Sequence, residues 1–298
     1  MNNCPYCQST ATKKSYLEDT FFNDKTFSYL QCKKCSVIYI DPFPDQSDYE
    51  VMYPVEYQGE IFQKATQKYF RLFEQIKIYR PGAKTILDYG CGNAELICDA
   101  KAFGFVPSGV EYSPVFITEV RKRNPEIDFF TIDDFHQKNN DQYDIIVMNN
   151  VLEHLTNPNE ILQQLKDKLN ENGLLICLGP IENNFTLALF FRKMIFGIRK
   201  KILNKKATHV PYHISFTNVE NQKMIFVQNK LKELYFSTEE VAWPFPEKIN
   251  YKSPKSILFA SIAKISMGIS KLFSKTAGNT FLYIGTKSGN NYNQEKKY

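Results

Sequence analysis

Residues 85–95 of this 298-residue chain read Thr-Ile-Leu-Asp-Tyr-Gly-Cys-Gly-Asn-Ala-Glu, an apolar run that ends in Asp88 and is followed by Gly90 and Gly92. This pattern predicts a β-strand that turns sharply into a helix, because glycine adopts backbone angles and allows close ligand approach that a Cβ atom would prevent. The carboxyl ends of parallel strands are where open α/β sheets bind their ligands. We therefore expect the principal binding site at this turn.

The segments on both sides of this turn show two kinds of periodicity. Apolar and β-branched runs predict strands at 85–89, 106–111, 127–131, 144–149 and 174–179. Helical spacing predicts helices at 61–79, 94–103, 114–123 and 158–170. Such alternation predicts an α/β fold with a parallel sheet that helices cover on both faces.

The spacing of the glycines separates two kinds of nucleotide site. A dinucleotide fingerprint, G-x-G-x-x-G, needs a third glycine where this chain has Glu95, so a dehydrogenase is disfavoured. The segment instead resembles motif I of the class I methyltransferases that use S-adenosylmethionine (SAM), (D/E)-x-G-x-G-x-G. Asp88, Gly90 and Gly92 match that motif, and Ala94 stands at its last glycine. The resemblance implies a Rossmann-like, seven-stranded, mostly parallel sheet whose last strand inserts antiparallel beside the fifth.

Acidic positions extend the expected cofactor site. Glu111 ends the next strand, 23 residues after the aspartate of motif I, where a carboxylate can accept hydrogen bonds from both ribose hydroxyls of a nucleoside. In the family, an acidic or polar side chain after the third strand bonds the adenine amino group, which implies Asp133, with Asp134 as the second choice. Cys91 and Tyr112 adjoin these motifs and are expected in the same site.

The stretch from Asn149 to Leu155 resembles motif IV and the Leu-Glu-His segment of many small-molecule members of the family. The resemblance implies that Asn149 and Asn150 line the methionine end of SAM. A hydroxyl acceptor also has to lose a proton, and His154 is a candidate general base because an imidazole titrates near physiological pH. A histidine that only holds its loop is the alternative. His213 is the second candidate, because an H-x-x-F-(T/S) segment faces the acceptor pocket in similar methyltransferases with an N-terminal zinc ribbon.

Two C-x-x-C pairs lie near the N-terminus, separated by 24 residues, and comprise Cys4, Cys7, Cys32 and Cys35. Four thiolates at this spacing are typical of a tetrahedral Zn²⁺ site, and a redox pair is the alternative. Aromatic and β-branched residues at 26–31 and 37–40 predict the short strands of a zinc ribbon. A unit of about 40 residues is too small for a core of its own, so the zinc is expected to be structural.

Composition predicts one principal domain with small additions. A signal-peptide pattern is lacking, as is any run of about 18 apolar residues, so we expect a cytoplasmic protein. The net charge of +5 is too small to indicate nucleic-acid binding by itself. The expected parts are a zinc-ribbon unit at 1–45, a linker with a docking helix at 46–80, a SAM-binding domain at 81–287 with a lid at 183–210, and a polar tail at 288–298.

Two segments, 185–206 and 257–275, combine large apolar residues with lysine and arginine. This composition is typical of a helix on a membrane surface, and packing against the sheet is the alternative. A lipid-linked or phosphate-bearing acceptor would account for both segments. It would bring the protein to the inner face of the membrane.

The resemblance implies methyl transfer from SAM to a small or carrier-linked acceptor, with O-methylation of a sugar or surface-glycan precursor in polysaccharide biosynthesis as the leading hypothesis. C-methylation of a nucleotide sugar, or methylation of a natural-product or quinone ring, is the alternative within the same class. An RNA-modifying zinc-ribbon protein is an alternative of another class, which the basic run at 192–206 would favour. The chain lacks the (N/D/S)-P-P-(Y/F) tetrapeptide of base N-methyltransferases at motif IV, so a nucleic-acid partner is disfavoured.

Overall fold

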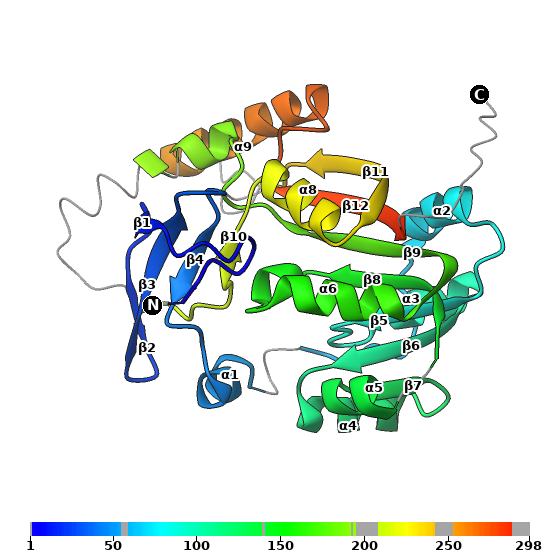
Figure 1. Cartoon of the computed structure of the whole chain (residues 1–298). Coiled ribbons are helices and arrows are strands. Elements are labelled where there is room, and N and C mark those ends of the chain that lie inside the picture. Colours follow the sequence, from blue (N-terminus) through cyan, green and yellow to red (C-terminus); the bar gives the residue numbers. More distant parts are fainter. Residues whose placement is uncertain are drawn as a thin grey trace.

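A seven-stranded sheet forms the centre of the protein in the computed structural model, which describes residues 2–54, 59–138, 141–191, 193–194, 208–241 and 253–287 (Figure 1). The strands lie in the order β11 (Leu231–Glu239), β12 (Thr280–Lys287), β9 (Leu169–Pro180), β8 (Tyr143–Asn149), β5 (Thr85–Tyr89), β6 (Val106–Glu111) and β7 (Asp128–Thr131). β12 runs antiparallel to both neighbours, and the pairs from β9 to β7 are parallel. The predicted fold class is therefore confirmed, including the antiparallel last strand.

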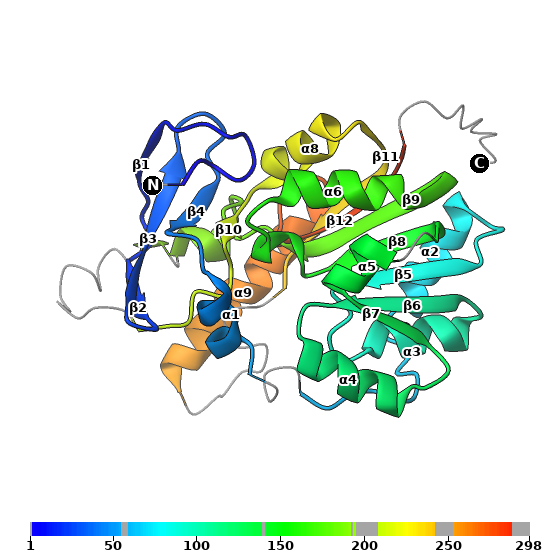
Figure 2. The same cartoon turned by 60° about the horizontal axis from the view of Figure 1, so that its bottom comes forward.

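Helices cover both faces of this sheet, because its strands bury alternate side chains on opposite sides (Figure 2). Ile86 and Leu87 are adjacent and fully buried on β5, yet they belong to different apolar clusters. The cluster around Leu87 includes side chains from α5 (Ile132–Lys138), α6 (Pro158–Asp167) and α8 (Val219–Gln228). The cluster around Ile86 includes side chains from α2 (Phe70–Tyr79) and α3 (Glu95–Phe103), and α4 (Pro114–Arg123) packs beside α3.

The N-terminal segment forms a second sheet that the main domain completes. Its strands are β1 (Thr12–Lys14), β2 (Thr20–Phe22), β3 (Lys25–Cys32), β4 (Ile38–Asp41) and, from much later in the chain, β10 (Ser215–Phe216). β10 pairs antiparallel with β4, with Ser215 opposite Tyr39 and Phe216 opposite Ile38. The cysteine-bearing unit is therefore joined to the larger domain by backbone hydrogen bonds as well as by packing.

A short helix, α1 (Gln46–Met52), links this second sheet to the cavity described below. Asp45 and Asp48 form a capping box at the start of α1. Lys25 on β3 contacts the carboxylates of both, at 2.6 Å and 2.8 Å. These contacts hold α1 against β3 of the second sheet. The helix ends before Tyr53.

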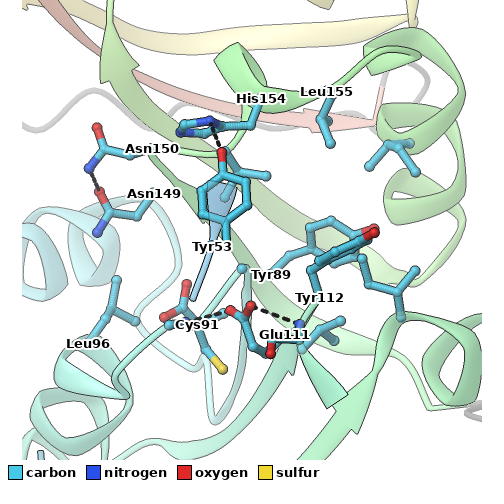
Figure 3. A pocket seen from close by; sticks show the side chains of 18 of the residues that line it. Tyr53, Tyr89, Cys91, Leu96, Glu111, Tyr112, Asn149, Asn150, His154 and Leu155 are labelled. Atoms are coloured by element: carbon cyan, nitrogen blue, oxygen red, sulfur yellow. Dashed lines mark hydrogen bonds between the residues drawn. The ribbon is translucent and has the colours of Figure 1, made fainter. Parts of the chain in front are cut away.

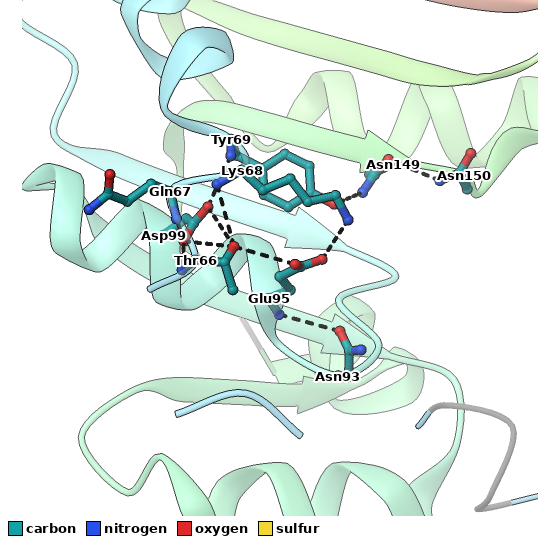
Figure 4. Close-up of polar contacts among 9 residues, drawn as sticks. All are labelled: Thr66, Gln67, Lys68, Tyr69, Asn93, Glu95, Asp99, Asn149 and Asn150. Atoms are coloured by element: carbon teal, nitrogen blue, oxygen red, sulfur yellow. Dashed lines mark hydrogen bonds and ion pairs between the residues drawn. The ribbon is translucent and has the colours of Figure 1, made fainter. Parts of the chain in front are cut away.

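The helix expected at 61–79 begins only at Phe70, and the cause is the buried carboxylate of Asp99 on α3 (Figure 4). Oδ1 of Asp99 accepts hydrogen bonds from the backbone N–H groups of Thr66 and Gln67, at 2.6 Å and 2.9 Å. Its Oδ2 accepts from the N–H of Tyr69 at 2.9 Å. Gln67 has a positive φ of 64°, which a continuing helix does not permit. The chain thus enters α2 through a turn that Asp99 organises.

Replacing Asp99 with alanine is expected to lower the free energy of unfolding by about 3 kcal/mol. The change leaves three backbone donors without their charged acceptor, and each hydrogen bond to a charged group contributes about 1.5 to 3 kcal/mol without full additivity. Urea denaturation measures the effect. Asp167→Ala, at an exposed position of α6, is the matched control and should change stability by less than about 0.5 kcal/mol.

The last long helix, α9 (Pro254–Leu272), lies near β11 at the edge of the sheet (Figure 1). Ile262 and Ala263 of α9 are buried beside Ala188, which belongs to the helical residues 187–191. Within the described residues, none of the helices is both long enough and apolar enough to span a bilayer. Most of the predicted basic run, Arg192 and residues 195–206, lies outside the described residues, as does the predicted tail at 288–298.

Candidate functional site

A cavity of about 540 Å³ lies at the carboxyl ends of β5, β6 and β8 (Figure 3). Its volume is in the range of small-molecule sites. Nine of the residues predicted for function border it, namely Asp88, Gly90, Cys91, Gly92, Glu111, Tyr112, Asn149, Asn150 and His154. A cavity therefore lies beside the glycine turn, where the sequence predicted a binding site.

The glycine turn needs its special residues for steric reasons. Gly90 has a φ of 85°, and a Cβ atom there would lie 2.5 Å from Cγ2 of Val151. Gly92 also has a positive φ, of 46°. Ala94, at the position of the last glycine of motif I, adopts φ 65° and is fully buried at the start of α3. Alanine thus reproduces the left-handed backbone that glycine supplies in the motif, at a cost of about 1 kcal/mol.

Glu111 is held at the end of β6 with its carboxylate directed by backbone donors (Figure 3). Its Oε2 accepts from the N–H of Gly92 at 3.0 Å, and its Oε1 accepts from the N–H of Ser113 at 3.2 Å. These bonds fix the carboxylate beside the glycine turn while leaving its further lone pairs for a ligand. The arrangement fits two neighbouring hydroxyls of a ribose.

Asp88 is 2% exposed, and its Oδ1 has no hydrogen-bond partner among the described residues. Burial, together with the nearby charge of Glu111, raises the pKa of Asp88 to about 7. A buried carboxyl oxygen without a partner can accept a hydrogen bond from a ligand or lie beside a cation. SAM carries a positively charged sulfonium and an ammonium group, so the orphaned oxygen fits this cofactor.

SAM affinity is expected to increase with pH because of Asp88. Its ionised form attracts the cationic cofactor, and with a pKa of about 7 the ionised fraction rises about tenfold between pH 6 and pH 8. The dissociation constant should fall by up to the same factor when measured by calorimetry across that range. Asp88→Asn should bind SAM more weakly and lose this pH dependence. A wild-type affinity independent of pH would contradict the role of Asp88.

Aromatic side chains from the N-terminal arm complete the wall of the cavity, and the sequence did not assign them to the site. Tyr49 and Tyr53 come from α1 and its end, and Tyr69 precedes α2. Tyr69 accepts a hydrogen bond from Asn149 at 2.9 Å (Figure 4). Tyr49 packs against Tyr112, with ring centroids 5.4 Å apart. The sequence shows that this stretch is rich in tyrosine. Which residues Tyr49 and Tyr53 contact depends on how α1 docks, and the sequence does not show that.

His154 borders the cavity on the side opposite Glu111 (Figure 3). Its Nδ1 lies 2.9 Å from the hydroxyl of Tyr53 and 2.8 Å from the carbonyl oxygen of Tyr212. Burial, and the neighbouring charge of His213, lower the pKa of His154 to about 4, so the ring is neutral near pH 7. Burial also raises the pKa of Glu153 to about 7.

Asp133, Asp134 and His213, all within the described residues, lie outside the lining of the cavity. Asp133 and Asp134 occupy the first turn of α5, where Ile132 is the residue that borders the cavity. The ring of His213 packs behind His154, with centroids 5.0 Å apart. His213 was expected to face the acceptor pocket, but of these two histidines it is His154 that borders the cavity.

The four cysteines of the N-terminal unit converge, with all four sulfur atoms within 4.8 Å of one another. Sγ of Cys4 lies 3.5 Å from Sγ of Cys35, and the same distance separates Cys7 from Cys32. These distances exceed a disulfide bond and are close to the ~3.8 Å between sulfurs that share a tetrahedral zinc ion. The hydrogen bond between Cys4 and Cys35 lowers the pKa of the Cys4 thiol and raises that of Cys35, so the two sulfur atoms share a proton. The four side chains fit a zinc ion.

Comparisons with known proteins agree with this geometry. The sequence profile of a methyltransferase-domain family matches residues 57–229. The ubiquinone biosynthesis O-methyltransferase of Glaesserella parasuis serovar 5 (strain SH0165) is 30% identical over 102 residues, which are 31% of this chain and 43% of that protein. The chain thus matches less than half the length of this curated relative.

Two solved structures are similar to this chain at low sequence identity. A chain from the complex between the Haloferax volcanii Trm112 methyltransferase activator and a methyltransferase matches with a TM-score of 0.50 and 13% identity, over 76% of this chain and 92% of that one. A SAM-dependent methyltransferase from Archaeoglobus fulgidus matches with a TM-score of 0.45 and 17% identity, over 74% of this chain and 95% of that one. With more than half of its length matched by the family profile, the chain belongs to the methyltransferase-domain family, among the class I SAM-dependent methyltransferases.

Proposed function

We propose that the protein transfers a methyl group from SAM to a hydroxyl group of a small or carrier-linked acceptor. The observation that carries this proposal is one cavity with two chemically different ends. Glu111 and the glycine turn lie at one end, and His154 with Tyr53 lies at the other. A cofactor held at the first end would present its methyl group toward the second.

The roles of the residues follow from what the reaction requires. The acceptor oxygen forms a bond to the methyl carbon as the carbon–sulfur bond breaks, which yields a methyl ether and S-adenosylhomocysteine. Alignment of these atoms accounts for most of the catalysis. Glu111 would hold the ribose, and Asn149 and Asn150 would hold the methionine end. The proton of the acceptor hydroxyl would leave at the end of the cavity where His154 lies, with His213 behind it.

A sugar or surface-glycan precursor is our leading acceptor. Tyr53 lines the cavity at the end where His154 lies, with its hydroxyl 2.9 Å from Nδ1 of that ring, and tyrosine combines an apolar surface with a polar tip that suits a hydroxylated ring. A quinone-like ring is the second candidate, because the curated relative that matches part of the chain is named for ubiquinone biosynthesis. Both acceptors present a ring hydroxyl to the same end of the cavity.

We further propose that the acceptor is attached to a lipid carrier. α9 exposes Leu258, Ile265 and Leu272, which are 58%, 57% and 80% accessible, while Ile262 and Ala263 are buried. Phe185 is also 79% exposed. The seven-residue spacing places Leu258, Ile265 and Leu272 on one face of α9, and an exposed apolar helix face is typical of a membrane contact.

Mass spectrometry of extracts from cells with and without the gene tests the proposal. The expected result is an acceptor that is about 14 Da lighter in the deletion strain, with restoration by the wild-type gene but not by Glu111→Ala. Separate analysis of the lipid and water-soluble fractions distinguishes a carrier-linked acceptor from a free one. A 14 Da difference on an RNA nucleoside would instead establish the RNA-modifying alternative.

A further inference from the structure

Glu153, His154 and His213 form a cluster of metal-ligand side chains beside the acceptor end of the cavity. Each offers one ligand atom, and the three atoms lie within 4.8 Å of one another. Glu153 and His154 belong to the short helix η2 (Leu152–His154). The N–H of Ile214 donates to the carbonyl of Glu153 at 2.8 Å, which holds His213 beside η2. Backbone contacts therefore bring the three side chains together.

His154 directs an unprotonated nitrogen toward Glu153. Its Nδ1 lies 2.8 Å from the carbonyl oxygen of Tyr212, and because a carbonyl only accepts, Nδ1 carries the hydrogen. Nε2 of the neutral ring then holds a lone pair, and it lies 3.6 Å from Oε1 of Glu153. That separation is too long for a hydrogen bond. Two electron-rich atoms thus face each other without a proton shared between them.

Oε1 of Glu153 is a buried acceptor with no hydrogen-bond partner among the described residues. The residue is 5% exposed, so bulk water does not compensate for the missing partner. Burying a carboxylate without a partner is costly, and such an atom calls for an explanation. A cation between Oε1 of Glu153 and Nε2 of His154 provides one.

Both histidines have the outer contacts that are typical of metal ligands. Nδ1 of His213 lies 2.5 Å from Oε2 of Glu182, which is 7% exposed. Nδ1 of His154 is bonded to the carbonyl of Tyr212. A ligating histidine almost always donates its second ring N–H to a carboxylate or a carbonyl, which fixes the ring for coordination. His213 would accordingly coordinate through Nε2.

We propose that Glu153, His154 and His213 bind a divalent transition-metal ion, separate from the four-cysteine site. Two imidazoles and one carboxylate suit Mn²⁺, Fe²⁺, Co²⁺, Ni²⁺ or Zn²⁺. Ligand atoms around such an ion lie about 3.0 to 3.4 Å apart, so the 3.6 Å between Nε2 of His154 and Oε1 of Glu153 is already close to the separation that binding requires. Because His154 borders the cavity, a further coordination position would face the acceptor.

The consequence for catalysis rests on the proposed function. A cation in this place would bind the acceptor hydroxyl and lower its pKa, so that the hydroxyl would lose its proton to water before its oxygen takes the methyl group. Nε2 of His154 would then be a metal ligand, so it would not serve as the general base. Whether the reaction depends on a metal ion therefore decides if Nε2 of His154 is a metal ligand or a general base.

Electron paramagnetic resonance of Mn²⁺ tests the site without measuring activity, because the signal of free Mn²⁺ disappears on binding. Mn²⁺ also favours oxygen and nitrogen ligands over the thiolates of the ribbon. Titration of the full-length protein carrying one equivalent of zinc per chain, which the four thiolates would hold, is expected to show one saturable Mn²⁺ site per chain. Glu153→Gln and His213→Gln should weaken it at least tenfold, and Glu182→Gln should weaken it by about 10- to 100-fold.

His136→Gln is the control, because His136 lies outside the cluster, and it should leave Mn²⁺ affinity unchanged. The side chain of His213 is 29% exposed, so its variant tests the site even if Glu153→Gln fails to fold. The absence of saturable Mn²⁺ binding, or unchanged affinity in both cluster variants, would overturn the inference. Calorimetry with SAM on the same samples separates the two proposals: protein that binds SAM but not Mn²⁺ refutes the metal site alone.

Discussion

Glu111→Ala is expected to weaken SAM binding by about 100-fold or more. In the proposed role, the carboxylate would accept hydrogen bonds from two ribose hydroxyls, and each bond to a charged group contributes about 1.5 to 3 kcal/mol. A loss of about 3 kcal/mol corresponds to a factor of more than 100 in the dissociation constant. The N–H groups of Gly92 and Ser113 also lose their acceptor, which loosens the glycine turn. Calorimetric titration with SAM measures the effect.

Two further variants show whether the loss is specific to this carboxylate. Glu126→Ala removes an exposed glutamate whose contact is Lys101, and it should leave SAM affinity unchanged. Glu111→Gln should lose less affinity than Glu111→Ala because it keeps an acceptor oxygen. It should also move the pH dependence of SAM binding to lower pH, since the charge of Glu111 helps to raise the pKa of Asp88. Equal affinity in Glu111→Ala and the wild type would refute the assignment of the cofactor site.

Loss of one ribbon cysteine, as in Cys35→Ser, is expected to lower the melting temperature by about 10 °C and to reduce methyl transfer at least tenfold. Metal binding supplies the folding energy of a small unit of this kind, and a loss of several kcal/mol shifts the melting temperature of a domain this large by about that much. The ribbon carries β4, which pairs with β10, and Lys25, which holds α1. Its unfolding would release Tyr53 from His154. Differential scanning calorimetry and a zinc assay measure the first effect.

Cys98→Ser is the matched control, because Cys98 is a buried cysteine on α3 that lies outside the four-cysteine cluster. It should keep its zinc content and nearly all of its activity. The SAM affinity of Cys35→Ser should change much less than its activity, because Glu111 and the glycine turn belong to the central sheet. Wild-type protein that contains no zinc, or a Cys35→Ser variant with an unchanged melting temperature, would contradict a structural zinc site.

The elements that local sequence encodes were predicted closely. β5 and β6 have the predicted bounds of 85–89 and 106–111, because apolar or β-branched runs and the glycines of a turn are features of neighbouring residues. The start of α2 was not predicted. Helical spacing continued back to residue 61, yet the carboxylate of Asp99 binds the backbone of Thr66 and Gln67 and imposes a turn there. The spacing of apolar residues within one segment cannot reveal a contact with a residue 33 positions away.

The sequence by itself determined the sheet, the glycine turn that borders the cavity and the four-cysteine unit, since each depends on residue types at short, fixed spacing. Tertiary structure alone decided the acceptor end. Tyr53 reaches His154 from 101 positions away, and Glu182 reaches His213 from 31 positions away. β10 completes a sheet that begins near the N-terminus. The physical reason is that these contacts depend on how separately folded segments dock, and docking is set by the packing of whole surfaces rather than by the spacing of residues along the chain.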